Sequence, residues 1–308
     1  MENKDSIVQL YKKLYSENFT ELEVLRKKEK MKVLIAITMI ITLIAIVFFY
    51  KWGFIFLWLG VIVFIITFAI INSKNRGKNK VDYTSVFKEK IVAPIIQKAI
   101  PNSLYKPNEG ISKEIYNKIV YKEWYDRYRS EDLIKASVLL KNGKEVNMQI
   151  AEVLTERETK DKDGDTSYVT VFTGMAGVVE MTKTIKTSVF IVKNGSVSKF
   201  NKKKVKLDSS SFEALFDVEA DDSIMAMRIL TADIMEKLEY LYAKLKIKFE
   251  FSIVNDKLYI KFHTGGMYEP SIFNKSLELQ KLQKLYNTTT LITDVIKEMA
   301  MVIDEIHV

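Results

Sequence analysis

The sequence predicts an α+β protein, in which an N-terminal two-helix transmembrane hairpin precedes a cytoplasmic domain whose antiparallel sheet is covered by helices, with a long C-terminal helix. Three observations predict this class. Two uncharged apolar runs follow each other near the N-terminus, polar and apolar residues alternate over residues 246–262, and a heptad pattern runs through the C-terminal region. We divide the chain into an N-terminal amphipathic helix (1–32), the hairpin (33–71), a basic linker (72–84) and a cytoplasmic α+β domain (85–308).

The predicted hairpin consists of Val33–Tyr50 and Phe54–Ile71, which contain no Asp, Glu, Lys, Arg or His. As a helix, each run approaches the hydrocarbon thickness of a bilayer, about 30 Å. Basic residues cluster before the first run and after the second, whereas the turn between them carries only Lys51. Because basic flanks stay on the cytoplasmic side, we expect a two-span protein of the cell membrane with both termini cytoplasmic.

Composition limits the chemistry of the chain. It contains no Cys, which excludes disulfides, thiolate zinc sites and a cysteine nucleophile. The formal net charge of +8 is matched by the basic residues that flank the hairpin, and such residues attract anionic headgroups. We therefore expect the lipid bilayer, and not nucleic acid, as a partner.

Several helices are expected before the sheet. Apolar residues at helical spacing predict a helix over residues 6–30, interrupted near Ser16. Residues 85–99 form a second amphipathic pattern, which Pro94 should kink or end. A short helix is predicted over residues 111–119, with Ser112 as its N-cap.

Strands dominate the middle of the chain. Asn142-Gly143 lies between two apolar runs, and this dipeptide favours a hairpin because both residues accept positive φ. The predicted strands are Ala136–Leu140, Glu145–Glu156, Ser167–Thr173, Ser188–Val192 and Val205–Leu207.

Two helices and a hairpin follow. The helices are expected over residues 222–230 and 231–245, the second with Thr231 as its N-cap. Residues 246–262 alternate so that a two-residue turn at Asn255-Asp256 places Phe249 opposite Phe262 on one apolar face. That face should be covered by helices.

The C-terminal helix is expected over residues 275–307. Its apolar stripe could pack on the sheet, or could pair with the N-terminal helix or a second subunit. The stripe consists of Leu282, Leu285, Thr289, Ile292, Ile296, Met299, Ile303 and Ile306.

Several short segments carry a family resemblance, which is densest over residues 212–230 and covers most of residues 85–275. The segments are Tyr128–Leu133, Ala151–Val153, Val171–Met175, Phe216–Val218, Arg228–Thr231, Lys257–Ile260 and Glu269-Pro270. With the two apolar runs, they resemble the bacterial membrane-protein family known as domain of unknown function 3137. The sequence differs at Ser130, where the pattern leads us to expect Gly. The resemblance implies a membrane anchor and an α+β cytoplasmic domain, and brings no catalytic residues.

Four sets of polar residues are candidate sites. The loop Asp161–Asp165 lacks the spacing of an EF-hand, so we expect a solvated turn. His263 is expected on an exposed strand face. Glu219, Asp221 and Asp222, followed by Arg228, could form a hard-cation or acid/base site, but a helix cap at Asp221 or Asp222 is favoured. Arg129, Glu131 and Asp132 are interpreted as a loop salt-bridge cluster.

We therefore predict no catalytic, cofactor-binding or metal-binding residues, no cofactor, and no enzyme activity. The predicted function is that of a membrane-anchored interaction or scaffold protein, which binds other membrane or cytoplasmic proteins and itself. The alternatives are a lipid-binding or membrane-sensing module and, third, a membrane-bound enzyme that uses the carboxylates around Asp222.

Overall fold

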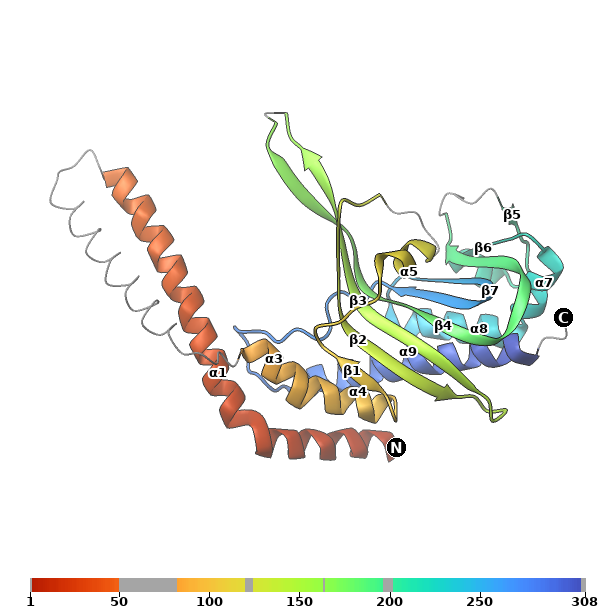
Figure 1. Ribbon diagram of the computed structural model, residues 1–308, viewed down its shortest axis with the longest axis horizontal. Helices are drawn as coiled ribbons and strands as arrows, with labels where there is room; N and C mark the ends of the chain where they lie inside the picture. The colour runs from red at the N-terminus through yellow and green to blue at the C-terminus, as the bar shows by residue number, and fades with distance from the viewer. Residues whose placement is uncertain (1, 50–81, 120–123, 163, 196–201, 306–308) are drawn as a thin grey trace. The chain divides into compact units, whose positions relative to one another are not determined.

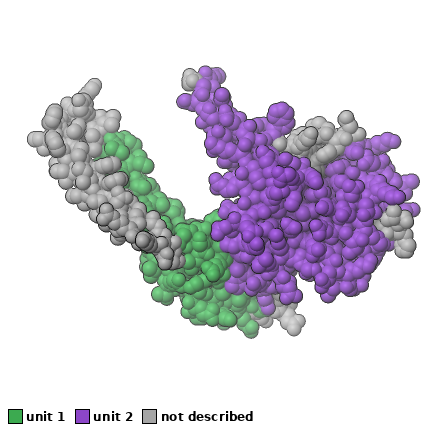
Figure 2. Space-filling model, viewed as in Figure 1, with its two compact units in different colours: residues 1–91, 269–282 green, residues 92–268, 283–308 purple. Residues whose placement is uncertain are grey.

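The computed structural model describes residues 2–49, 82–119, 124–162, 164–195 and 202–305 (Figure 1). The chain divides into two compact units, residues 1–91 with 269–282 and residues 92–268 with 283–308 (Figure 2). Each unit therefore combines segments that are far apart in the sequence.

Unit 1 is built around α1 (Glu2–Phe49) and α3 (Tyr83–Phe87). Arg26 of α1 is 9% exposed and donates hydrogen bonds to the Glu23 carboxylate and to Ile272 O (3.0 Å). Ser276 N donates to the same carboxylate (2.9 Å). Arg26 and Ser276 lower the pKa of Glu23 to about 2, with the Arg26 hydrogen bond as the largest cause. Arg26 thus ties α1 to residues 269–282.

The structure contradicts the predicted transmembrane hairpin. It therefore also contradicts the predicted two-span localisation in the cell membrane. Within the described ranges, no helix is long and apolar enough to cross a membrane. The second predicted span, Phe54–Ile71, and the linker residues 72–81 lie outside the described residues.

The N-terminal helix is confirmed, without the predicted interruption near Ser16, because α1 is continuous from Glu2. After α3 the chain forms a π-helical turn, η2 (Lys88–Val92), and then α4 (Ala93–Ala99). The change of helix type lies directly before Pro94, which lacks the amide donor that a continuous α-helix would use. The predicted effect of Pro94 is confirmed.

The sheet belongs to unit 2 and is antiparallel throughout, as predicted. The strand order is β1-β2-β3-β4-β6-β5, and β7 also pairs with β4. The strands are β1 (Leu104–Lys106), β2 (Arg127–Leu139), β3 (Glu145–Lys160), β4 (Thr166–Lys193), β5 (Lys203–Lys204), β6 (Phe216–Ala220) and β7 (Phe249–Phe262).

Residues 249–262 fold back on themselves, as the alternation predicted. His263 N donates to Lys248 O (2.9 Å), and the rings of Phe249 and Phe262 lie 5.8 Å apart. Asn255 has a φ of 57°, as a tight turn requires. Both arms pair with β4, one along residues 175–180 and the other along 188–191. The predicted strands 167–173 and 188–192 are therefore two ends of one long strand.

Helices cover both faces of the sheet. One face packs under α5 (Lys113–Lys118), which Ser112 caps by accepting a hydrogen bond from Ile115 N, as predicted. The other face lies against α8 (Ala232–Leu245) and α9 (Leu279–Glu305) (Figure 1). Tyr242 of α8 makes edge contacts with Phe216 and Phe249 of the sheet. Two short helices, α6 (Ser210–Leu215) and α7 (Ser223–Ile229), flank β6.

The C-terminal stripe is buried. From Leu285 to Ile303 all of its predicted members are at most 6% exposed, and Ile306 lies outside the described residues. The long helix is confirmed, and its apolar stripe contributes to the core. A partner surface must therefore be sought elsewhere on the molecule.

Candidate interaction site

The three carboxylates near Asp222 have separate structural roles. Asp222 caps α7, because its Oδ1 accepts hydrogen bonds from Ile224 N (2.9 Å) and Met225 N (3.2 Å). Asp221 pairs with Lys202, which holds the pKa of Asp221 below its ordinary value. Glu219 is buried within β6. The capping interpretation is confirmed for Asp222, and Arg228 lies in the last turn of the same helix.

The face that carries His263 is covered, contrary to the prediction of an exposed face. His263 is half-buried and meets the Phe172 ring edge-on at 4.9 Å. Lys261, two residues earlier, is 2% exposed, with its Nζ 4.5 Å from the centre of the Phe172 ring and 3.8 Å from Glu250 Oε2. The sequence pattern missed this because α5 packs over side chains that alternate with the apolar face.

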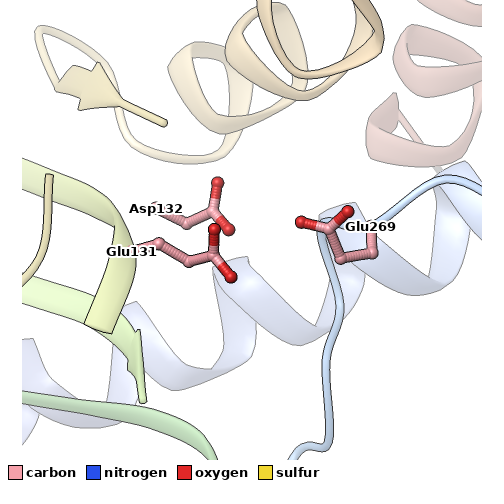
Figure 3. Close-up of side chains that lie close together, drawn as sticks. All are labelled: Glu131, Asp132 and Glu269. Carbon is pink, nitrogen blue, oxygen red and sulfur yellow. The ribbon is translucent and has the colours of Figure 1, made fainter. Parts of the chain in front are cut away.

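Glu131 and Asp132 lie in β2 and not in a loop (Figure 3). A β-bulge separates Glu131 from Ile134, and Asp132 at the bulge is fully buried with a φ of 59°. Its carboxylate accepts a hydrogen bond from Tyr105 OH. Burial, and then the bond to Asp132, raise the pKa of the Tyr105 phenol. Glu269, labelled in the same view, belongs to unit 1, where it pairs with Lys88.

A second buried carboxylate, Glu152 of β3, accepts hydrogen bonds from Met267 N (2.5 Å) and Tyr268 N (3.3 Å). Burial, and then the Glu152 charge, raise the pKa of Tyr268. Asp132 and Glu152 are thus each engaged by protein donors. We interpret them as ties within the fold that fix β1 and the 267–268 segment to the sheet.

A groove of about 420 Å³ lies between α8 and α9, lined by charged side chains above Leu291 and Val295. Lys237 Nζ lies 2.6 Å from Asp233 Oδ2 and 2.9 Å from Glu298 Oε2. Lys141 also pairs with Glu298. Two of the four acidic residues that line the groove, Asp233 and Glu298, are therefore paired with lysines.

The outer ends of β3 and β4 form a two-stranded ribbon that extends beyond the rest of unit 2 (Figures 1 and 2). It begins after a bulge, where the pairing shifts from Thr155 with Phe172 to Glu156 with Thr170, and it continues to Lys160 with Thr166. The predicted turn at Asp161–Asp165 closes its tip, with Asp165 N donating to Asp161 Oδ1 (2.9 Å). Residue 163 lies outside the described residues.

The β3 edge of the ribbon is protected. The neighbouring strand β2 reaches it at the pair Arg127 with Glu156. Beyond that pair, the Asp126 carboxylate accepts a hydrogen bond from Glu158 N (2.6 Å). The exposed end of β3 also carries Arg157, Glu158 and Lys160. Charged side chains of this kind discourage the pairing of an edge with a further strand.

The β4 edge has neither form of protection. Thr166–Phe172 contains no charge and no Pro, and four of its residues are Val, Tyr or Phe. Pairing of β4 with β7 begins only at Met175, and Gly265 N reaches Thr173 O (3.3 Å). Among the residues that the structure describes, no strand pairs with Thr166–Phe172 on that side. We call this segment the free edge.

Side-chain contacts hold the ribbon in place without covering the free edge. The guanidinium of Arg127 lies 3.2 Å from the centre of the Tyr168 ring, and Thr159 Oγ1 lies 2.7 Å from Ser167 Oγ. Val169, at the middle of the free edge, is 50% exposed. The alternating sequence predicts a strand over residues 167–173, but alternation does not reveal which strand edges stay unpaired, so it does not indicate a site there.

The comparisons with known proteins confirm the family resemblance over part of the chain. The model of the family described as "Protein of unknown function (DUF3137)" matches residues 170–301. The resembling segments before residue 170 lie outside this match, and the match does not extend to the membrane and bacterial aspects of the resemblance. A comparison with curated proteins gives no match.

One solved structure is distantly similar, the crystal structure of the mycobacterial trehalose monomycolate transport factor A, TtfA. It has 5% sequence identity, and the alignment covers 69% of this chain and 93% of that chain with a TM-score of 0.35. At this TM-score the likeness carries no inference about function.

Proposed function

We propose that this chain, with its DUF3137 match over residues 170–301, is a protein-interaction module that binds an extended protein segment along the free edge of β4. One observation carries the proposal: an uncharged, β-prone edge on a ribbon that extends beyond the sheet. We infer a scaffold role, in which the domain holds protein chains together.

The physical basis is the backbone of the free edge. An edge strand presents a row of N–H and C=O groups, and an extended segment can pair with them as an added strand. Main-chain hydrogen bonds then supply affinity, while side chains such as Val169 and Tyr168 supply specificity. A two-stranded hairpin is marginally stable in water, so a third strand would also stabilise the ribbon.

The contrast between the two edges supports a role in binding. On β3, the charged side chains and the hydrogen bond from Glu158 N to the Asp126 carboxylate protect one side of the ribbon from further pairing. The same protection on β4 would require only one charged residue among its exposed positions. Its absence on an exposed strand favours binding over simple structural support.

A photoreactive amino acid in place of Val169 tests the proposal in cells that express the full chain. The matched control carries the same amino acid in place of Thr159, which lies on the protected strand of the same ribbon. We expect a discrete adduct from position 169 that is weak or absent from position 159. The adduct should also be lost when Val171→Lys places a charge on the free edge.

Identical adducts from both positions, or none from position 169, would contradict the proposal. Circular dichroism of each variant shows whether the sheet has formed. The adduct's partner is then identified by mass spectrometry.

A further inference from the structure

We infer that the segment bound by the free edge is the free edge of a second copy of this chain, so that two ribbons form a four-stranded antiparallel sheet. This inference rests on the proposed function and specifies its partner. Three arguments support it: the uncharged sequence of the free edge, the positions at which the free edge ends, and the closure of a two-fold interface.

Val169 is the middle residue of the free edge, with three residues on each side. An antiparallel two-fold axis through this residue places Val169 opposite its own copy, and Tyr168 opposite Thr170. It also places Ser167 opposite Val171 and Thr166 opposite Phe172. All of these pairs are uncharged, so no like charges meet. Aromatic and β-branched pairs of this kind each contribute to sheet stability.

The length of the free edge fits the same arrangement. On one side it is limited by the turn at Asp161–Asp165, and on the other by the Gly265 hydrogen bond to Thr173 O. The two limits lie at similar distances from Val169 along the strand. A second copy centred on Val169 can therefore pair with the whole free edge. The pairing ends at the Asp161–Asp165 turn on one side and at the Gly265 hydrogen bond on the other.

The assembly would close at two chains. In a two-fold interface the same surface is used by both copies, so pairing consumes both free edges. The outer strands of the four-stranded sheet would then be the two β3 ends, which carry Arg157, Glu158 and Lys160 and the hydrogen bond to Asp126. Because those edges are protected, further addition of strands is disfavoured.

The absence of Cys from the chain permits a clean test by crosslinking. A Val169→Cys variant of the full chain has a single thiol, which the two-fold axis places opposite its own copy, with Cβ atoms about 5 Å apart. A short bis-maleimide should therefore convert most of the chain to a covalent dimer. The reaction is monitored by denaturing gel and by the mass of the product.

Thr159→Cys is the matched control, because Thr159 is a partly exposed residue of the same ribbon and lies on the protected strand β3, where it pairs with Ser167 of β4. In the four-stranded sheet the two β3 strands lie three strand spacings apart, about 14 Å, so this variant should yield at least tenfold less dimer. Equal yields from the two variants, or no dimer from a Val169→Cys thiol that reacts with a monofunctional maleimide, would overturn the inference.

Charge exchange provides a second readout that does not depend on crosslinking. Val169→Lys places two ammonium groups opposite each other and should weaken self-association by about tenfold or more. Val169→Glu should have a similar effect alone, whereas an equimolar mixture of the two variants should restore association, because Lys then faces Glu. Failure of the mixture to associate more tightly than either variant would count against the two-fold register.

The two proposals fail in different ways. If the photoreactive residue at position 169 captures another protein while Val169→Cys forms no dimer, the edge binds a partner but the partner is not a second copy. If neither reagent reports a contact at position 169, both proposals are wrong.

Discussion

The strands β3 and β4 form two unlike regions of the same hairpin, a body within the sheet and a ribbon beyond it. In the body, Ile150, Ala151 and Val153 of β3 are at most 2% exposed, and Ala176 and Val179 of β4 are fully buried. In the ribbon, beyond Glu156 and Thr170, most side chains are exposed. Neighbours make the difference, because β2, β7 and the covering helices surround only the body.

The body and the ribbon should differ in what their residues control: stability in the body and binding in the ribbon. Residues of the body are constrained by close packing, so substitutions there should change the free energy of unfolding. The ribbon has few packing constraints, yet its β4 strand carries no charge and leaves Val169 50% exposed. This contrast is expected if β4 packs within the body and contacts another chain in the ribbon.

The largest effect is expected in the body at Gly177. A Cβ atom there would lie 2.1 Å from Gln149 O and 2.8 Å from the Ile150 Cα of the neighbouring strand. Because backbone cannot move aside as a flexible side chain does, Gly177→Ala should lower the free energy of unfolding by about 3 kcal/mol. Chemical denaturation measures the change. Thr170→Ala in the ribbon should change the free energy of unfolding by less than about 0.5 kcal/mol. Similar losses from both variants would show that the ribbon is packed as tightly as the body.

A somewhat smaller loss is expected for Asp132→Ala. This change removes the acceptor of the buried Tyr105 hydroxyl and places Ala at a positive φ. The expected loss is about 2 kcal/mol. Asp132→Asn retains an acceptor and tolerates the same φ, so it should lose less in the same denaturation experiment. Equal losses from the two variants would show that the charge, which both remove, stabilises the bulge more than the hydrogen bond does.

The helix cap at Asp222 should matter less again. Asp222→Ala leaves two amides at the start of α7 without their acceptor, which should cost about 1 kcal/mol. The neighbouring variant Asp221→Ala breaks only an exposed ion pair with Lys202 and should cost less than about 0.5 kcal/mol. Thermal unfolding of both variants checks the order, and the reverse order would refute the assignment of the cap.

The smallest effect on stability is expected in the ribbon. Val169→Lys should leave the free energy of unfolding within about 0.5 kcal/mol of the original chain, when both are measured at a concentration where the chain is monomeric. The same variant should lose self-association in analytical ultracentrifugation. A variant that unfolds readily would place Val169 in the packed structure of the monomer and would remove the distinction between body and ribbon.

Much of unit 2 could be predicted from local patterns. The turn at Asn255, the caps at Ser112, Asp222 and Thr231, and the C-terminal stripe follow from short-range chemistry and appear in the structure. Each of these features depends on residues that lie close together in the sequence and are therefore also in contact.

Features that depend on distant neighbours were missed. Lys261 is buried near Tyr116 of α5, whose ring centre lies 5.9 Å from Lys261 Nζ, and α5 lies far from Lys261 in the sequence. Asp132 was interpreted as a loop residue because a bulge within a strand has no simple pattern. The basic residues before the first apolar run were predicted to orient a membrane hairpin, whereas one of them, Arg26, is buried against residues 269–282 of unit 1. The free edge could not be predicted either, because only the complete sheet shows which strand ends lack a neighbouring strand.

Hydrogen–deuterium exchange of the full chain, recorded at low and high protein concentration, compares body and ribbon in one experiment. Within residues 166–172, the amides that point away from β3 should exchange rapidly in dilute protein and become protected as concentration rises. Those of residues 175–179, which lie between β3 and β7, should be protected at both concentrations. Exchange in residues 166–172 that is independent of concentration would contradict self-association through the free edge.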